Sequence, residues 1–224
     1  MSADTSDTTD TKPVLFVTGC QKYRQYVDAA LIRFANPAWH IVGIVGSATT
    51  EEATATTATR NGDIVTLPVP DTYEALPTKI HAAFSWIAAN YPNTVGIFKT
   101  DDDIVFGDMA HLARAIALCE ARPYWGLFVG NCRENPVNQA RIQMRFDDKT
   151  LQPRHQAATY CYGHGYWVSA AALPHILAAG DEFRASYLED VCVGAVLNRA
   201  GIVPARVALP YSELQRTPEL LSAK

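Results

Sequence analysis

The sequence predicts an α/β protein whose first half is a Rossmann-like, nucleotide-binding unit. Apolar runs of strand length alternate with segments of helical spacing up to about residue 122, which is typical of a parallel sheet covered by helices. One of these runs, starting at Gly96, ends in three consecutive aspartates, and open α/β sheets bind ligands at such strand ends. With 224 residues, the chain has room for one sizeable domain. We expect a disordered tail over residues 1–11 and a single domain over 12–224.

The elements of the first half follow from the apolar runs and from their end signals. Asn36-Pro37 ends the first helix, and Asp108 has the position of an N-cap. Pro68 lacks an amide hydrogen, so the strand that contains it is expected at a sheet edge. The Thr- and Ala-rich stretch 47–59 fits either a weak helix or a surface loop. In order, the expected elements are strand 14–18, helix 26–34, strand 41–46, strand 64–69, a helix that ends at Asn90, the aspartate strand, and a helix after Asp108.

The second half, from about residue 123, has a different character. A strand over 124–130 is followed by a polar stretch, 131–156, which is long for a connection and is expected to be mobile and to face substrate. Aromatic residues and glycines then fill 160–169 and lead into a helix over 170–178. A further helix, over 188–197, begins with two carboxylates.

The aspartates Asp101, Asp102 and Asp103 predict a cation site. Adjacent carboxylates repel one another, and burying them unpaired costs several kcal/mol unless a cation lies among them. Anionic oxygen ligands suit Mg²⁺ or Mn²⁺ better than zinc, and such a cation commonly carries substrate phosphates. An isolated acidic triplet is more often a solvated turn, but the apolar strand before it favours a metal-bound nucleotide here.

A glycine-rich turn in the second half allows two interpretations. Gly163 and Gly165, which flank His164, either relieve backbone strain or let a sugar or diphosphate lie against the backbone. In the second case Tyr166 or Trp167 would be the stacking face, because an aromatic ring buries the C–H groups of a sugar well.

The charged motifs on either side of this turn are also open to two interpretations. Glu189 and Asp190 either complement the positive end of a helix or include a general base. Asp71, Tyr73 and Lys79 frame a helix start and, taken alone, are a cap, a packing residue and a solvated lysine.

Composition excludes several function classes. A formal net charge of −4 gives no electrostatic reason to expect nucleic acid as a partner. No apolar stretch approaches the roughly 20 residues that span a bilayer, and the N-terminus lacks the basic and apolar regions of a signal peptide. The five cysteines are odd in number and far apart, so neither a zinc site nor a dense disulfide framework is indicated. We therefore expect a soluble, cytoplasmic protein in a reducing compartment.

Four motifs, taken together, resemble the beta-1,3-galactosyltransferase and Fringe-like family (glycosyltransferase family 31). The resemblance covers roughly residues 63–202, and the joint match is much more specific than any of its parts. The motifs are, in order, Asp71-x-Tyr73-x-x-Leu76-x-x-Lys79, Lys99-x-Asp101-Asp102-Asp103, Tyr162-Gly163-x-Gly165-Tyr166-x-Val168-Ser169 and Glu189-Asp190-Val191-x-x-Gly194.

The resemblance implies a GT-A type glycosyltransferase fold, in which a Rossmann-like half shares a mixed central sheet with the rest of the domain. The nucleotide-binding half would cover about residues 12–122 and the acceptor half about 123–224. The resemblance further implies a UDP-sugar donor, a glycan or glycoconjugate acceptor, a divalent metal (Mn²⁺ or Mg²⁺) and inversion at the anomeric carbon.

The same resemblance implies roles for individual residues. Asp103 and Asp101 would hold the metal, Asp190 would be the base, and Glu189 would orient the substrate or the base. The late histidine that relatives often use as a metal ligand has no counterpart, because the last histidine is His175. The implied nucleotide-sugar site contains Thr18, Gly19, Asp71, Tyr73, Lys79, Asp101 and Asp102, and the implied donor and acceptor pocket contains Gly163, His164, Gly165, Tyr166 and Trp167.

Two other functions fit parts of the pattern. A nucleotidyltransferase that makes a nucleotide-sugar would show a glycine-rich, basic phosphate loop after the first strand, and the segment from Thr18 to Gln21 is a poor version of one. A non-catalytic carbohydrate-binding protein would keep the aromatic residues but would have no reason to keep both the aspartates and the Glu-Asp pair. The expectation is therefore an inverting glycosyltransferase.

Overall fold

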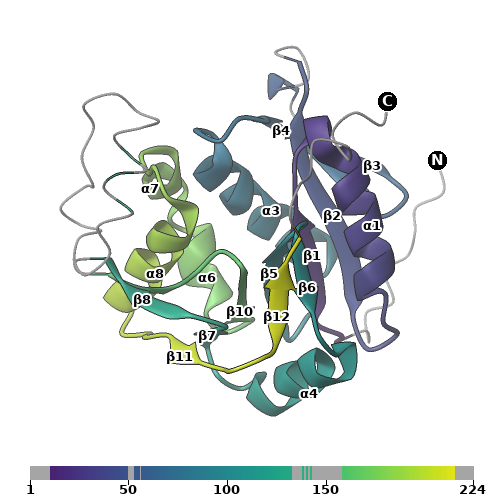
Figure 1. The fold of residues 1–224 in the computed structure, drawn as a ribbon. Helices are drawn as coiled ribbons and strands as arrows, with labels where there is room; N and C mark the ends of the chain where they lie inside the picture. Colours follow the sequence, from purple (N-terminus) through teal and green to yellow (C-terminus); the bar gives the residue numbers. More distant parts are fainter. Residues whose placement is uncertain are drawn as a thin grey trace.

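The structure is a computed structural model, and it describes residues 11–49, 53–55, 57–132, 138, 140, 142 and 158–214. Strands from both halves of the chain join one eight-stranded sheet, in the order β11-β7-β10-β5-β1-β2-β4-β3. Its core is four parallel strands, β4 (Ile64–Pro70), β2 (His40–Ser47), β1 (Val14–Thr18) and β5 (Gly96–Asp101), with helices between them (Figure 1). The Rossmann-like half predicted from the sequence is therefore confirmed.

The second half of the chain continues this sheet with strands of mixed direction. Strand β10 (Gly165–Ser169) pairs antiparallel with both β5 and β7 (Tyr124–Gly126), and β11 (Ala205–Arg206) pairs parallel with β7. Two small sheets lie beside it, one of β6 (Ile104–Phe106) with β12 (Tyr211–Glu213) and one of β8 (Val129–Asn131) with β9 (Thr159–Cys161). A Rossmann-like half followed by a mixed region of the same sheet is the predicted GT-A arrangement.

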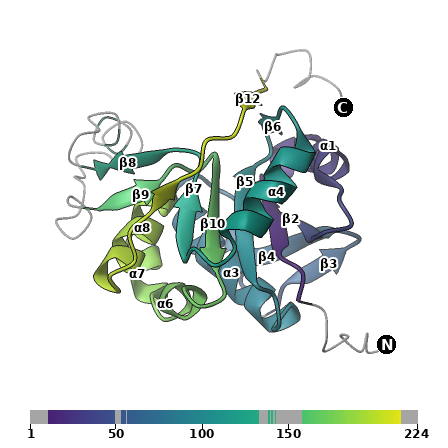
Figure 2. The same cartoon turned by 90° about the horizontal axis from the view of Figure 1, so that it is seen from below.

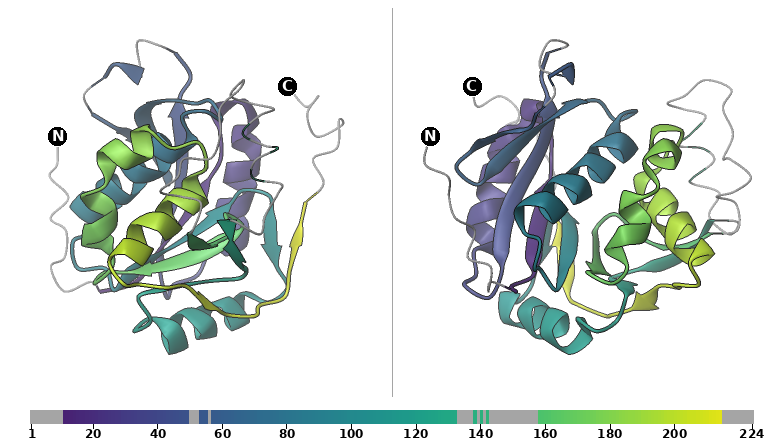
Figure 3. Two further views of the ribbon diagram at one scale, coloured as in Figure 1. Left: turned by 90° about the vertical axis from the view of Figure 1, so that its left-hand side faces the viewer. Right: turned by 180° about the vertical axis from the view of Figure 1, so that it is seen from behind.

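Helices cover both faces of the large sheet. Figure 2 shows α1 (Arg24–Phe34) and α4 (Met109–Cys119) on one side, with α3 (Leu76–Asn90) and α6 (Leu173–Leu177) on the other. In the two views of Figure 3, the green helices α6, α7 (Gly180–Arg184) and α8 (Glu189–Arg199) lie on the same face as α3, and α3 contacts all three. Among the described residues, no helix has the length and apolar character that crossing a membrane requires.

Successive residues of the central strands alternate between the two hydrophobic cores. Val14 and Phe16 of β1 pack into the core under α3, and Leu15 and Val17 pack into the core under α1 and α4. This alternation follows from the period of two along a strand. It makes both faces of the sheet apolar, which explains why the strands read as continuous apolar runs in the sequence.

The strand that contains Pro68 was expected at a sheet edge, and this prediction is wrong. Strand β4 is internal, because β3 (Thr59–Asn61) pairs antiparallel with it and forms the edge. The pairing with β3 involves residues 64–66 and ends before Pro68, and on the other side the β2 register shifts between Val45 and Ser47. The missing amide of Pro68 therefore falls where the ladder is already interrupted.

Most other element predictions are confirmed, with changed boundaries. Asp108 caps α4 as expected, because its Oδ1 accepts a hydrogen bond of 2.8 Å from the amide of Ala110. The expected strand 124–130 is divided into β7 and β8, and the helix expected over 170–178 is shortened to α6. A short 3-10 helix, η1 (Gln21–Tyr23), follows β1. Tail residues 1–10, residues 50–52 and 56 of the Thr- and Ala-rich stretch, and most of the polar stretch 131–156 lie outside the described residues.

Candidate active site

The predicted site residues follow strands that end at one edge of the sheet. Thr18 ends β1, Asp71 follows β4, and Asp101 ends β5. Thr18 and Asp101 are register partners in the parallel ladder, so the first strand and the aspartate strand end side by side. Ligands of open α/β sheets bind at this edge.

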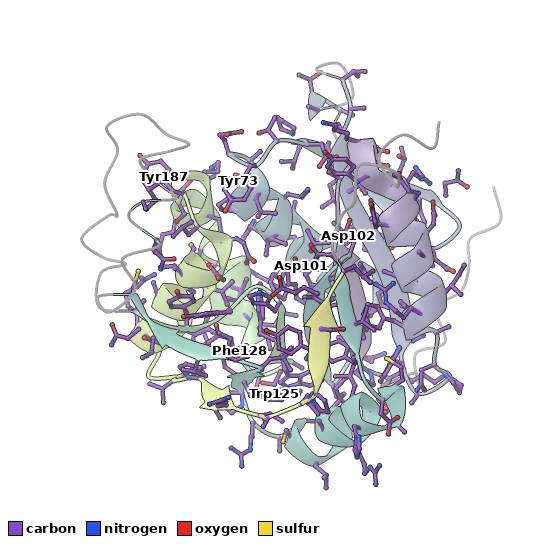
Figure 4. All side chains as sticks on the ribbon, in the orientation of Figure 1. Tyr73, Asp101, Asp102, Trp125, Phe128 and Tyr187 are labelled. Atoms are coloured by element: carbon purple, nitrogen blue, oxygen red, sulfur yellow. The ribbon has the colours of Figure 1, made fainter. Side chains whose placement is uncertain are left out.

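A cavity of about 540 Å³ opens between the aspartate strand, the β9–β10 turn and the start of α8. In Figure 4, Asp101 lies near the centre of the molecule, and Tyr73 and Tyr187 both lie above it and to its left. The cavity brings together residues that are far apart in the sequence, and its walls are rich in tyrosine. Its lining residues are Tyr73, Leu76, Lys99, Asp101, Asn138, Tyr160, Tyr162, Gly163, His164, Tyr187, Leu188, Glu189 and Asp190.

Lys99 lies at the base of this cavity and was not predicted as a site residue. Only 1% of its surface is exposed, and its Nζ donates to Asp101 Oδ1 at 2.6 Å, to the Gly163 carbonyl at 2.7 Å and to Glu189 Oε1 at 3.1 Å. The two carboxylates outweigh the effect of burial and raise the pKa of Lys99, so the lysine is charged. A lysine inside a strand buried on both faces was the signal in the sequence, because such a residue is rarely buried without partners.

Glu189 and Asp190 have different surroundings although they are neighbours. Glu189 is 5% exposed, and both of its oxygens are engaged, Oε1 by Lys99 and Oε2 by the hydroxyl of Tyr166 at 3.0 Å. Asp190 is only partly buried, and the hydrogen bonds that it accepts within the described part of the chain come from two backbone amides: Gly163 on Oδ2 at 3.2 Å and Val191 on Oδ1 at 2.8 Å. Asp190 is therefore the carboxylate that a bound substrate can reach.

The pKa of Asp190 suits it to proton transfer near neutral pH. Burial, and then the negative charge of Glu189, raise the pKa of Asp190 to about 7. The two amides and the charge of Lys99 act in the opposite direction and limit this rise. A base with a pKa near the working pH is the one that best combines a large ionised fraction with proton affinity.

The three aspartates differ in accessibility. The Asp101 side chain is 36% exposed and Asp103 is partly exposed, whereas Asp102 is buried. Their backbone is fixed by neighbouring elements: the Asp102 amide donates to Thr18 O at 3.2 Å, and Arg33 donates to the carbonyls of Asp102 and Ile104 at 3.0 Å each. Asp101 and Asp103 are thus the members of the triplet that can meet a ligand.

This donor set fits a hard divalent cation that is held mainly by substrate. The described residues contain no group of three or more His, Cys, Asp or Glu arranged to hold a metal. Mg²⁺ and similar ions commonly take one or two carboxylates from the protein and complete their shell with phosphate oxygens and water. Two partly exposed carboxylates on one turn, Asp101 and Asp103, meet that requirement.

Asp71 and Lys79 form a buried ion pair that ties several strand ends together. Lys79 Nζ donates to Asp71 Oδ1 and to the Gly19 carbonyl, both at 2.8 Å. The Asp71 carboxylate also accepts the amides of Gly46, at 3.1 Å, and of Gln21. The pair therefore joins the ends of β1, β2 and β4 to α3, and neither residue is the cap or solvated lysine that the motif alone would suggest.

A second cavity, of about 430 Å³, lies at the ends of β1, β2 and β4. Asp71 and Thr72 line it, and Tyr73, the next residue, lines the first cavity. Residues 71–73 thus connect the two cavities along one edge of the sheet. The other lining residues are Gln21, Lys22, Ser47, Ala48, Thr49, Ala53 and Pro70.

Tyr166, which was expected in the sugar pocket as a stacking face, is fully buried and lines neither cavity, so this prediction is wrong. Trp167 does not line either cavity, and its expected place in the sugar pocket is corrected. It is fully buried in the core under α1 and α4, stacked on Trp125 with ring centroids 6.3 Å apart. Adjacent strand residues point to opposite faces, so Trp167 faces away from Tyr166, which points toward Glu189. Gly165 is also buried, where an added Cβ would lie 3.0 Å from Leu127.

The aromatic residues that reach the first cavity are tyrosines, and most were not predicted. Tyr162 stacks on Tyr160, with ring centroids 5.3 Å apart, and Tyr187 precedes the carboxylates of α8. His164 lines the same cavity, and its Nε2 lies 2.9 Å from Glu213 Oε1 of β12. The alternation of aromatic and small residues over 160–166 was the available signal. The side of the sheet on which each ring lies depends on strand pairing, which the sequence does not show.

Comparison with known proteins gives relatives of one kind. A human acetylgalactosaminyl-O-glycosyl-glycoprotein beta-1,3-N-acetylglucosaminyltransferase is 27% identical over 157 residues, which are 69% of this chain and 40% of the relative. Beta-1,3-galactosyltransferase 1 of Mus musculus is 29% identical over 143 residues, which are 63% of this chain and 43% of the relative. The chain thus spans about two fifths of the length of these curated relatives.

Similarity to solved structures is weaker. A mannose-1-phosphate geranyltransferase from Thermus thermophilus aligns with a TM-score of 0.43 at 14% identity, over 91% of this chain and 76% of that one. The family comparison is more informative, because the galactosyltransferase family matches residues 37–208, well over half of the chain. That range contains every motif on which the family 31 resemblance rests, so the chain belongs to the galactosyltransferase family.

Proposed function

We propose that the protein is a metal-dependent, inverting glycosyltransferase that moves a sugar from a UDP-sugar to a hydroxyl of a glycan acceptor. One observation carries this proposal: Asp190, a carboxylate with a pKa of about 7, lines the same cavity as Asp101 of the aspartate turn. A base and an anionic donor-side turn at one cavity are what a transfer between a sugar phosphate and a hydroxyl requires.

The two cavities accommodate the two parts of such a donor. The nucleoside would occupy the cavity at the ends of β1, β2 and β4, beside Asp71 and Thr72. The diphosphate would cross the turn of Asp101 and Asp103, and the sugar would enter the larger cavity. Asp101 and Asp103 would hold Mn²⁺ or Mg²⁺, which when bound supplies positive charge against the charge that develops on departing UDP.

The residues of the larger cavity perform the transfer itself. The acceptor hydroxyl gives its proton to Asp190 while its oxygen forms a bond to the anomeric carbon of the donor sugar. The bond from that carbon to the UDP oxygen breaks on the opposite face, so the configuration inverts and UDP leaves with the electron pair. Tyr73, Tyr162 and Tyr187 offer ring faces against which the sugars can pack. Positioning of the two reactants supplies much of the remaining rate enhancement.

A UDP-release assay across a panel of UDP-sugars tests this proposal without a known acceptor. Slow hydrolysis of the correct donor is expected in Mn²⁺ and is expected to stop when EDTA is added. UDP should also raise the thermal midpoint of the protein, because a ligand that binds only the folded state stabilises it. If no donor is hydrolysed and UDP gives no stabilisation, the proposal fails, and a different donor or a binding role replaces it.

A further inference from the structure

The buried network around Lys99 joins the donor side of the proposed site to the acceptor side. Lys99 Nζ contacts Asp101, which belongs to the donor-side turn, and Glu189, which precedes the proposed base. These contacts, of 2.6 Å and 3.1 Å, come from one atom at the centre of the site. One ammonium group therefore fixes the end of β5 against the start of α8.

The peptide of Gly163 is held by the same network from both sides. Its carbonyl accepts from Lys99 at 2.7 Å, and its amide donates to Asp190 Oδ2 at 3.2 Å. A Cβ on this residue would lie 3.0 Å from Glu189 Oε1 and 3.3 Å from Lys99 Nζ, which is tighter than about nine in ten real contacts of such an atom. Because Gly163 has no side chain, its peptide can approach Lys99 and Glu189 closely. Its two backbone groups then link Lys99 to Asp190, the proposed base.

The other side of Glu189 is closed by Tyr166. The tyrosine hydroxyl donates to Glu189 Oε2 at 3.0 Å, and Tyr166 is fully buried in β10. Glu189 is thus held by a cation on one oxygen and by a hydroxyl on the other, whereas Asp190 is held by backbone amides and is the more accessible of the two carboxylates. The role of Glu189 therefore lies in its effect on the neighbouring residue, Asp190.

We propose that Lys99, Glu189 and Tyr166 are positioning residues that hold the proposed base, Asp190, at a fixed place in the cavity that it shares with Asp101, and that the opposite charges of Lys99 and Glu189 act on its carboxylate. This inference rests on the proposed role of Asp190 as the base. Stability alone is a poor explanation of the network, because a buried ion pair is often no more stabilising than apolar residues of the same size. The network instead fixes the position of the Asp190 carboxylate and places one positive and one negative charge near it.

The ion pair of Glu189 and Lys99 supplies two charges that act on Asp190 in opposite directions. Glu189 disfavours the ionised form of Asp190 and Lys99 favours it. The other titratable groups that interact with Asp190 are neutral at pH 7, because burial raises the pKa of each thiol or phenol. They are Tyr124 on β7, Cys132 after β8, Cys161 on β9 and Tyr166 on β10.

A direct test follows the ¹³C carboxyl signal of Asp190 against pH in the protein without donor or metal, with the signal assigned by Asp190→Asn. The wild-type midpoint is expected near pH 7. Glu189→Gln removes the negative member of the pair, and the midpoint should fall by about one pH unit. Adding Lys99→Met to Glu189→Gln removes the positive member as well, and the midpoint should return close to that of the wild type.

Recovery of the Asp190 midpoint after the second substitution, Lys99→Met, separates an effect of charge from a merely structural role. A residue that only supports the fold would give a double variant at least as disturbed as the single one. The matched control is Asp71→Asn with Lys79→Met, which neutralises a second buried lysine–carboxylate pair and should leave the Asp190 midpoint unchanged. An unchanged midpoint in Glu189→Gln, or a double variant that keeps the lowered value, overturns the proposal.

Tyr166→Phe tests the geometric part and changes a single hydroxyl. The expected result is a kcat lowered about tenfold with the donor KM within about twofold of wild type, because the base is displaced and donor contacts are not. An unchanged kcat overturns this part. Failure of the proposed function would appear differently, as absence of UDP release in the wild type, while the carboxyl titration would still report on the network.

Discussion

Two adjacent carboxylates, Glu189 and Asp190, show how the fold assigns chemistry residue by residue. Both begin α8, where negative charge is favourable next to the helix dipole. Both oxygens of Glu189 accept hydrogen bonds from buried side chains, Lys99 and Tyr166. Asp190 accepts from two backbone amides and lines the cavity. The family resemblance implied different roles for the two residues, and their contacts give a physical reason for that difference.

The pH dependence of transfer is predicted by Asp190. Burial and Glu189 raise its pKa to about 7, so below that pH the carboxyl is protonated and cannot accept the acceptor's proton. We expect log(kcat/KM) to fall with a slope of one as the pH decreases through about 7 and to level off above it. Initial rates from pH 5 to 9 measure this, and a rate that rises toward acid would contradict the assignment of an ionised base.

Gly163 is predicted to need its lack of a side chain. An added Cβ would lie 3.0 Å from Glu189 Oε1, so Gly163→Ala should shift the peptide that holds Asp190. We expect kcat to fall about tenfold, since small displacements of a catalytic group cost this much or more. Gly107→Ala is the control, because its Cβ would meet Pro210 at an ordinary 3.6 Å. Equal activity in the two variants would remove Gly163 from the positioning network.

At the scale of elements, the Asp71–Lys79 pair fastens α3 to three strand ends. The side chains are 7% and 4% exposed, so the pair is buried. Asp71→Asn leaves Lys79 charged and without its carboxylate, and we expect the free energy of unfolding to fall by about 3 kcal/mol. Urea denaturation with an unchanged m-value measures this.

The double variant Asp71→Asn, Lys79→Met provides the matching control for that prediction. Because it removes the unpaired positive charge of Lys79, the double variant should recover a large part of the lost stability. A double variant that is less stable than Asp71→Asn would show that the hydrogen bonds to Gly19, Gly46 and Gln21 matter more than the ion pair.

The elements themselves were predictable where one local signal decided them. Asp108 was recognised as a cap because its preference for that position is strong in isolation. The edge assignment of the strand with Pro68 failed because β3, Thr59–Asn61, starts at the end of the Thr- and Ala-rich stretch and has no apolar strand pattern of its own. Whether a strand is central or at an edge is decided by its partners, which lie elsewhere in the chain.

The same limit applies to the site. Motif order placed Asp101, Gly163, His164, Glu189 and Asp190, which the structure does bring to one cavity. Facing along β10 could not be predicted, so Trp167 was assigned to the pocket although it lies in the opposite core. Tyr73 was also among the predicted site residues and lines this cavity. The places of Tyr160, Tyr162 and Tyr187, and the convergence of three segments on the Lys99 ammonium, depend on tertiary contacts that local sequence does not reveal.

At the scale of the whole molecule, the sheet brings segments that are distant in the sequence together along one of its edges. The parallel half presents the ends of β1, β2, β4 and β5, and the antiparallel strand β10 brings the Gly163 turn and α8 against them. The two cavities therefore lie along one edge, with residues 71–73 between them. A donor with a nucleotide and a sugar fits this layout, and the acceptor must approach from the side of Asp190.

The central claim is that Asp190 removes the acceptor proton while other residues bind the nucleotide. The most direct measurement compares wild type and Asp190→Asn for UDP binding by calorimetry and for sugar transfer with Mn²⁺. We predict that the variant binds UDP within about twofold of wild type and loses transfer by about a thousandfold or more, as expected when a general base is removed. A variant that still transfers sugar, or that loses UDP binding instead, would contradict the account.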